Sequence, residues 1–276
     1  MRWSKADCAN LIKLKNKKMK TFISFSGGVE STTMCILYGK NAKGVWCDTG
    51  AEHEMMYERI NEVESRIRKI HPDFGIIRIY PKVKASGKTV NTLLEAVLLW
   101  KFMPSPLKRY CTKDFKIKPI DRFLKDQGNC RLLIGLNSDE TGRVGNLGLN
   151  KNVKYEYPLV EDGLNRGDCE DILNIYGLHP NFPAYMGRGG CSMCFFKSEK
   201  EYKAMFYQNN QEFIRMLEFE KQYQDKRRRT YSIMSSGKTL SQLAEECKNE
   251  LFKDEILSYY EQKNNTNKTC GPFCGR

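Results

Sequence analysis

A glycine pair between a strand-like and a helix-like segment is the first place where the sequence could do chemistry. Residues 24–32 read SFSGGVEST and follow the β-forming stretch TFI. Two glycines let the backbone approach a ligand closely, and a helix that begins near Val29 directs its free N–H groups at an anion. The segment is therefore expected to hold a phosphate through Ser24, Ser26, Gly27, Gly28, Ser31 and Thr32.

Two cysteines spaced by two residues, Cys191 and Cys194, form the second candidate centre. Thiolates at this spacing can chelate one metal ion or cluster, and the preceding GRGG turn offers N–H groups to the sulfur charge. A structural zinc would need two further ligands, and the chain has only 3 histidines. A redox pair is the third interpretation, but the strand and helix that usually flank such a pair are missing. The spacing leaves these alternatives open.

A second cysteine pair, Cys270 and Cys274, lies in the final segment TCGPFCGR. The intervening Gly-Pro predicts a tight turn, which suits a redox pair or a fourth metal ligand equally well. We interpret both residues as candidate catalytic thiols, with an inert terminal segment as the alternative. Six further cysteines are predicted to be small core residues: Cys8, Cys35, Cys47, Cys130, Cys169 and Cys247.

Basic residues crowd around one more cysteine, Cys111. Arg109, Lys113 and Lys116 are assigned to a substrate phosphate, and the alternative is that they lie on a solvated helix face. The net charge of +13, from 46 Lys and Arg against 33 Asp and Glu, suits a nucleic acid or a phosphorylated small molecule.

The composition sets limits on compartment. The 11 cysteines are an odd number and are dispersed, so a secreted disulfide framework is disfavoured. The sequence has no apolar run of membrane-spanning length, and its beginning does not have the pattern of a secretory signal. We expect a cytoplasmic protein with no membrane partner.

The elements that must position these residues alternate between two kinds. β-rich stretches at 21–26, 44–50, 75–81 and 131–136 are separated by helical patterns at 31–40, 55–70 and 90–102. This alternation predicts an α/β fold with a doubly wound, mainly parallel sheet over residues 1–197. A helical C-terminal subdomain is expected over residues 198–276, where Thr239 and Gln242 form a capping box. Ligands are then expected beyond the carboxyl ends of the strands.

Several colinear motifs resemble the PP-loop adenine nucleotide alpha hydrolase superfamily, and within it the phosphoadenosine phosphosulfate (PAPS) reductase-like family. SGGVES resembles the SGGxDS loop, with Glu30 in place of the usual aspartate. CDTG, CTKDFKIKPI, GLNSDETGR, YPLVEDG and GCSMC then follow in the family's order, between about residues 20 and 197.

The resemblance implies an adenine nucleotide and Mg²⁺ at the loop, with Glu30, Asp48, Gly135 and Arg143 among the nucleotide-binding residues. It also implies a [4Fe-4S] cluster on Cys111, Cys191 and Cys194. In the family's reductases an arginine stands at the position of Asn137, and a tryptophan follows the PL dipeptide; both are missing here.

These departures weaken the reductase interpretation. Cluster-bearing reductases of the family also have an adjacent cysteine pair where this chain has Tyr110-Cys111, and a single cysteine followed by CxxC resembles instead the family's cluster-bearing sulfurtransferases of DNA or tRNA. The resemblance then implies an enzyme that uses ATP to adenylate a nucleic acid and transfers sulfur to it, with AMP released. A sulfur donor such as a cysteine desulfurase would be a partner. Two alternatives remain: a sulfonucleotide reductase that releases sulfite, and a non-catalytic nucleotide-binding protein.

Overall fold

A five-stranded parallel sheet is the framework of the computed structural model, which describes residues 3–8, 19–85, 87–143, 150–187, 190–227, 232–234, 236–249 and 258. The strand order is β3-β2-β1-β6-β7. The strands are β1 (Lys20–Ser24), β2 (Ala42–Cys47), β3 (Ile76–Ile79), β6 (Cys130–Leu133) and β7 (Val153–Glu156). Since the order reverses between β1 and β6, this pair is the topological switch point of a doubly wound sheet.

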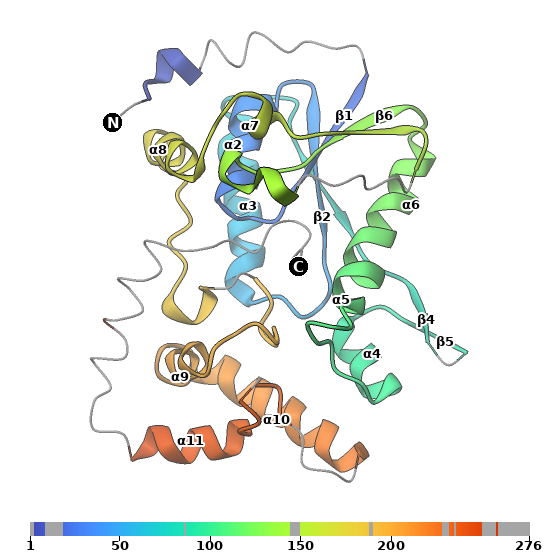
Figure 1. Ribbon diagram of the computed structural model, residues 1–276, viewed down its shortest axis with the longest axis vertical. Helices are drawn as coiled ribbons and strands as arrows, with labels where there is room; N and C mark the ends of the chain where they lie inside the picture. Colours follow the sequence, from blue (N-terminus) through green and yellow to red (C-terminus); the bar gives the residue numbers. More distant parts are fainter. Residues whose placement is uncertain are drawn as a thin grey trace.

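Helices cover both faces of the sheet (Figure 1). One face packs on α2 (Val29–Tyr38), α3 (Glu54–Arg68) and α8 (Arg166–Tyr176), and the other packs on α6 (Lys118–Asp126). Successive side chains of a strand point to opposite faces of the sheet. In β1, Ile23 packs in the hydrophobic cluster with α2, α3 and α8, and its neighbour Phe22 packs in the cluster with α6. The predicted fold class is confirmed.

Shorter elements connect these helices and strands. They are the antiparallel pair β4 (Val83–Ala85) and β5 (Lys88–Val90), the helices α4 (Leu93–Trp100), α5 (Tyr110–Thr112) and α7 (Pro158–Glu161), the π-helix η1 (Lys113–Ile117), and the 3₁₀ segments η2 (Ser138–Arg143) and η3 (Ala184–Met186). The β4–β5 pair and β7 were not expected from the sequence.

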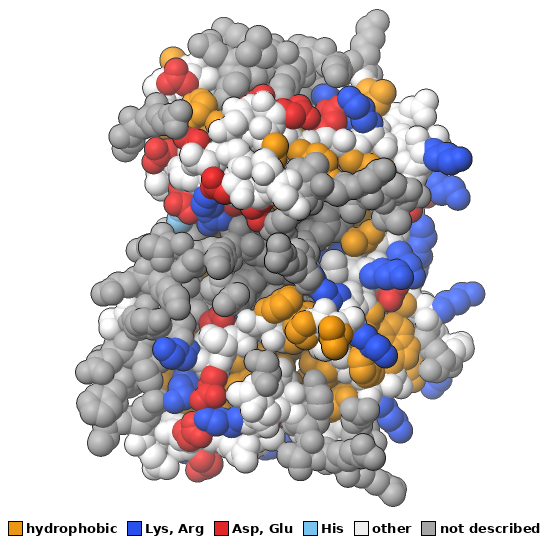
Figure 2. Space-filling view, viewed as in Figure 1, with side chains coloured by type: hydrophobic (Ala, Val, Ile, Leu, Met, Phe, Trp, Pro, Cys, Tyr) orange, Lys and Arg blue, Asp and Glu red, His pale blue; other side chains and the backbone are white. Residues whose placement is uncertain are grey.

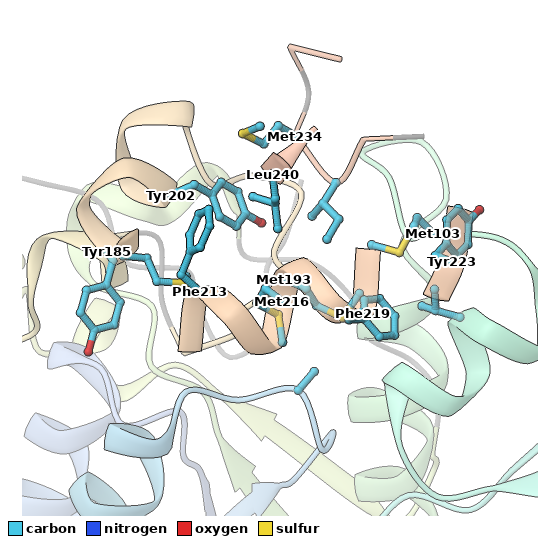
Figure 3. Close-up of a cluster of buried hydrophobic side chains, with 14 of the residues drawn as sticks. Met103, Tyr185, Met193, Tyr202, Phe213, Met216, Phe219, Tyr223, Met234 and Leu240 are labelled. Atoms are coloured by element: carbon cyan, nitrogen blue, oxygen red, sulfur yellow. The ribbon is translucent and has the colours of Figure 1, made fainter. Parts of the chain in front are cut away.

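Three helices follow the sheet: α9 (Glu199–Gln208), α10 (Asn210–Arg227) and α11 (Leu240–Lys248). Phe213, Met216 and Phe219 of α10 point into a buried cluster with Tyr202 of α9 and Leu240 of α11 (Figure 3). The predicted capping box is confirmed, because the Thr239 side chain accepts a hydrogen bond from the Gln242 N–H. The same cluster includes buried residues of α4, so these helices share a core with the sheet region.

The six cysteines predicted to be core residues are all buried, with at most 4% of each residue exposed. All nine cysteines of the described residues are free thiols. Among those residues no helix has both the length and the apolar character needed to cross a membrane.

Candidate functional site

The turn between β1 and α2 has the geometry of an anion site. Gly27 has a φ of +78°, which favours glycine, and a Cβ there would lie 2.7 Å from the Met56 side chain. Gly28 is the N-cap with extended backbone, so the strict conformational requirement falls on Gly27. No side chain caps this helix, which leaves its N-terminal N–H groups for a ligand.

The hydroxyl groups of the loop face one another. Ser26 Oγ and Ser31 Oγ are 3.1 Å apart, and Thr32 donates to the Gly28 carbonyl at 2.8 Å. Ser24 is buried at the end of β1. The structure therefore brings together the hydroxyl residues that the sequence assigned to a phosphate, at the switch point of the sheet.

Glu30 and Asn137, two departures from the resembled family, contact each other. The Asn137 side-chain amide donates to Glu30 Oε1 at 3.1 Å, and Arg166 Nη1 lies 2.7 Å from the same oxygen. Glu30 and Asn137 are buried. Arg166 also forms an ion pair with Glu170 at 2.6 Å. Because Arg166 and Asn137 contact the same Glu30 oxygen, a guanidinium from α8 lies near position 137, where the family's reductases carry an arginine.

The remaining nucleotide-site candidates lie at the same edge. Asp48 follows β2, and its carboxylate accepts hydrogen bonds from the Gly50 N–H at 2.8 Å and the Tyr57 hydroxyl at 2.9 Å. Gly135 packs against the first turn of α2: a Cβ there would lie 3.2 Å from the Ser31 nitrogen. Arg143 ends η2, and its side chain lies outside the described residues.

The segments that contain the three predicted metal ligands lie close together, since Cys191 interacts electrostatically with both Cys194 and Cys111. Backbone contacts join the segment after β2 to the Cys191 region, through a bridge between Glu52 and Cys191 and a Ser192 N–H bond to the Ala51 carbonyl. Cys111 comes from α5, which runs into the π-helix η1, and such π-turns are frequent at functional sites.

Burial raises the pKa of all three thiols, and each also interacts electrostatically with at least one of the others. The positive charge of Lys116 acts in the opposite direction on all three pKa values, but burial outweighs it. Its ammonium lies 3.4 Å from Glu52 Oε1. Burial acts to lower the pKa of Lys116 itself, but Glu52 and the thiols outweigh it and raise that pKa.

The side chains around the three thiols match the implied cluster in type. Three free thiols beside Lys116 and the buried Lys197 have the composition of a three-thiolate site with compensating positive charge. In the described part of the chain, however, no three His, Cys, Asp or Glu side chains are arranged to hold a metal ion. The cluster thus stays a prediction, supported by the ligand types and by their proximity. Cys270 and Cys274 lie outside the described residues.

The residues assigned to a substrate phosphate have different surroundings. Lys113 is exposed, whereas Lys116 is directed to Glu52 and the thiols. The guanidinium of Arg109 lies over the Phe196 ring, 5.4 Å from its centroid. Arg109 therefore joins the α5 segment to the segment that contains Cys194.

Sequence reasoning missed a buried polar group next to the thiols. His53 Nδ1 lies 2.9 Å from Glu212 Oε1, and both residues are buried. Lys197 is 1% exposed and donates to the Tyr185 carbonyl. Arg166 was also missed; it lies in the first turn of α8, where a cation opposes the helix dipole and signals an acidic partner.

The protein-family model described as the phosphoadenosine phosphosulfate reductase domain matches residues 20–151. This range contains the loop, Asp48, Gly135 and Cys111. No curated protein matches the chain.

Proposed function

Residues 20–151 belong to the phosphoadenosine phosphosulfate reductase domain family, and from this premise we propose that the protein is an ATP-dependent, AMP-forming sulfurtransferase that acts on a nucleic acid. The family supports nucleotide binding and enzymatic sulfur-nucleotide chemistry. The finer assignment depends on one observation: a second centre of three neighbouring thiols and a lysine accompanies the nucleotide loop.

The loop residues would bind the phosphates of ATP. N–H groups at the start of α2 and the hydroxyls of Ser26 and Ser31 would donate to phosphate oxygens, whereas Thr32 would stabilise the loop through its hydrogen bond to the Gly28 carbonyl. Arg166, fixed by Glu30, would place a positive charge beside them. Asp48 would hold Mg²⁺, which offsets charge on the phosphates.

Adenylation and sulfur transfer would then proceed in two steps. An oxygen of the acceptor attacks the α-phosphorus, and the bond from that phosphorus to the bridging oxygen breaks, so pyrophosphate leaves. Sulfide, which a thiol reductant would release with two electrons from the persulfide of a donor such as a cysteine desulfurase, then attacks the acceptor carbon; the bond from that carbon to the adenylated oxygen breaks, the sulfur loses its proton, and AMP leaves with the former acceptor oxygen.

The thiol centre would bind the sulfur before its transfer. A [4Fe-4S] cluster held by Cys111, Cys191 and Cys194 would supply an iron with no protein ligand, at which sulfide can bind. Lys116 would offset the negative charge of the thiolates. Cys270 or Cys274 would serve as a catalytic thiol or as a further ligand.

A sulfonucleotide reductase is the second candidate, and one observation favours it. Arg166 would take the role of the arginine missing at position 137, since its guanidinium contacts the same Glu30 oxygen as the Asn137 amide. A charged sulfonucleotide would therefore still meet a guanidinium at this site. The non-catalytic alternative has no such observation in its favour.

The product distribution separates these functions. Anaerobically purified protein is incubated with ATP, Mg²⁺, sulfide and total tRNA or sheared DNA, and in parallel with PAPS and a thiol. Pyrophosphate and AMP formed only with nucleic acid support the sulfurtransferase. Sulfite from PAPS supports the reductase and overturns the first proposal, and the absence of all three products supports a binding protein.

A further inference from the structure

Two adjoining hollows lie on the face formed by α4, α5, α6 and the β4–β5 pair. The first, of about 610 Å³, lies between the β4–β5 pair and α6. The second, of about 550 Å³, lies between the end of α4 and α5. They share Trp100 and Asp114 in their linings, so they adjoin, and we refer to the two hollows together as the groove.

Positive charge dominates this groove. The first hollow is lined by four basic residues, Lys82, Lys84, Lys118 and Arg122, and the second by three, Lys108, Arg109 and Lys113. The single acidic residue in either lining, Asp114, is paired with Lys118 at 2.6 Å. Figure 2 shows basic side chains along the side of the molecule where Figure 1 places α6, β4 and β5, with hydrophobic side chains beside them.

Aromatic rings form the other part of the wall. Trp100 and Tyr110 meet edge to face at 4.8 Å, Phe102 lies 6.0 Å from Tyr110, and all three are partly exposed. Partly exposed rings interleaved with cations are the features with which proteins bind unpaired bases and their phosphates. A fully paired duplex would hide the base faces that these rings could stack against.

Two residues of the second hollow lie next to the segments that contain the thiols. Tyr110 lines this hollow and precedes Cys111 directly, and Arg109 packs over Phe196, two positions after Cys194. We propose that this groove binds a single-stranded segment of nucleic acid and presents it to the thiol centre. The inference rests on the proposed function, and it narrows the class of nucleic-acid acceptor to an unpaired strand.

The test measures strand binding without ATP, Mg²⁺ or a sulfur source, so it is independent of the reaction. Fluorescence anisotropy of a labelled 20-nucleotide single strand is compared with that of the matching duplex for three proteins. These are the full chain, a groove variant (Lys84→Glu, Lys113→Glu, Arg122→Glu) and a control variant (Lys43→Glu, Lys69→Glu, Lys248→Glu). All six substituted lysines and arginines are exposed, and the control has the same change in net charge.

The full chain should bind the single strand more tightly than the duplex. The groove variant should bind about tenfold or more weakly, and its slope of log affinity against log salt should fall by about 2, because each single-strand phosphate contact contributes about 0.7. The control variant should lose less affinity for the single strand than the groove variant. Equal losses in both variants, or tighter binding to the duplex, would overturn the inference.

Tryptophan emission supplies an independent readout of stacking. Trp46 is buried, and Trp3 donates a hydrogen bond to Asp168, so an added strand should quench mainly Trp100. Trp100→Phe should remove the quenching while retaining most of the affinity. Quenching that persists in this variant contradicts the aromatic contact.

The two proposals can fail separately. Strand binding through the groove without AMP formation would retain this inference and overturn the proposed function. Nucleic-acid-dependent AMP formation that the groove variant does not weaken would retain the proposed function and overturn this inference.

Discussion

The guanidinium of Arg166 lies 2.7 Å from the carboxylate of Glu30, across 136 positions of the sequence. The contact joins the first turn of α8 to the first turn of α2, directly behind the loop that contains Gly27 and Gly28. Glu30 is favourable at the positive end of its helix dipole, whereas Arg166 is not. The ion pair compensates for this, and together with Glu170 it holds the Arg166 guanidinium next to the first turn of α2.

Arg166→Met should therefore affect both stability and binding. It leaves the buried Glu30 carboxylate without this partner, so the free energy of unfolding should fall by about 2 kcal/mol, discounted for the partial exposure of Arg166. ATP affinity should fall about tenfold, the size expected for one lost charge-assisted hydrogen bond. Urea unfolding and titration calorimetry measure the two effects.

A matched control is Arg68→Met, which removes an ion pair with Glu64 of 2.9 Å on the exposed side of α3. It should cost less than about 0.5 kcal/mol and leave ATP affinity unchanged. If the two substitutions had equal effects on binding, Arg166 would have no special role at the loop.

Gly135→Ala tests the packing behind the loop. Its Cβ would lie 3.2 Å from the Ser31 nitrogen and 3.3 Å from Glu30 atoms, so the first turn of α2 must shift. We expect ATP affinity to fall about tenfold and stability to fall by about 1 kcal/mol. Gly142→Ala is the control, since no neighbouring atom lies within 4 Å of a Cβ at that position. Unchanged ATP binding in calorimetry with Gly135→Ala would exclude tight packing of this turn as a requirement.

Local sequence patterns predicted the sheet and its ligand edge because each depends on a few adjacent residues. Alternating burial at Phe22 and Ile23 is a property of one strand, and the turn at Gly27 needs only its own backbone. The ion pair of Glu30 with Arg166 depends instead on how α8 packs against α2, which no local pattern contains. The β4–β5 strands have three residues each, too few for a recognisable alternation.

Stability should depend on pH through His53. Burial lowers its pKa below the ordinary value, although Glu212 acts in the opposite direction. Between the lowered pKa and about 6.5, the unfolded chain binds a proton that the folded chain does not, so this contribution is present above pH 6.5 and lost as pH falls. The slope should approach about 1.4 kcal/mol per pH unit at most.

Urea unfolding at pH 5 to 7 measures this slope, and His53→Gln should flatten it. Glu212 contributes in the same direction: burial acts to raise its pKa, but contacts with His53 and Arg215 outweigh this and lower it. An identical slope in the His53→Gln variant would assign the pH dependence to other groups.

Iron binding distinguishes the thiol centre from the other buried thiols. Anaerobic protein should contain iron and acid-labile sulfide, and Cys191→Ala should lose both because a cluster ligand is removed. Cys47→Ala is the matched control: this thiol also interacts with Lys116, but it is buried in the core and donates to the Phe115 carbonyl. Stoichiometric zinc without iron, or equal iron loss in both variants, would rule out the assigned cluster.

The C-terminal cysteines give the last prediction. Deleting residues 264–276 removes Cys270 and Cys274 but retains the nucleotide loop and every member of the buried clusters in the described part of the chain. ATP binding and stability should therefore be unchanged. Sulfur transfer should be lost if either thiol attacks or ligates, since thiol chemistry requires the sulfur itself. Cys270→Ser and Cys274→Ser, tested singly, assign the loss to one residue. Full sulfur transfer by the truncated protein would show that Cys111, Cys191 and Cys194 suffice.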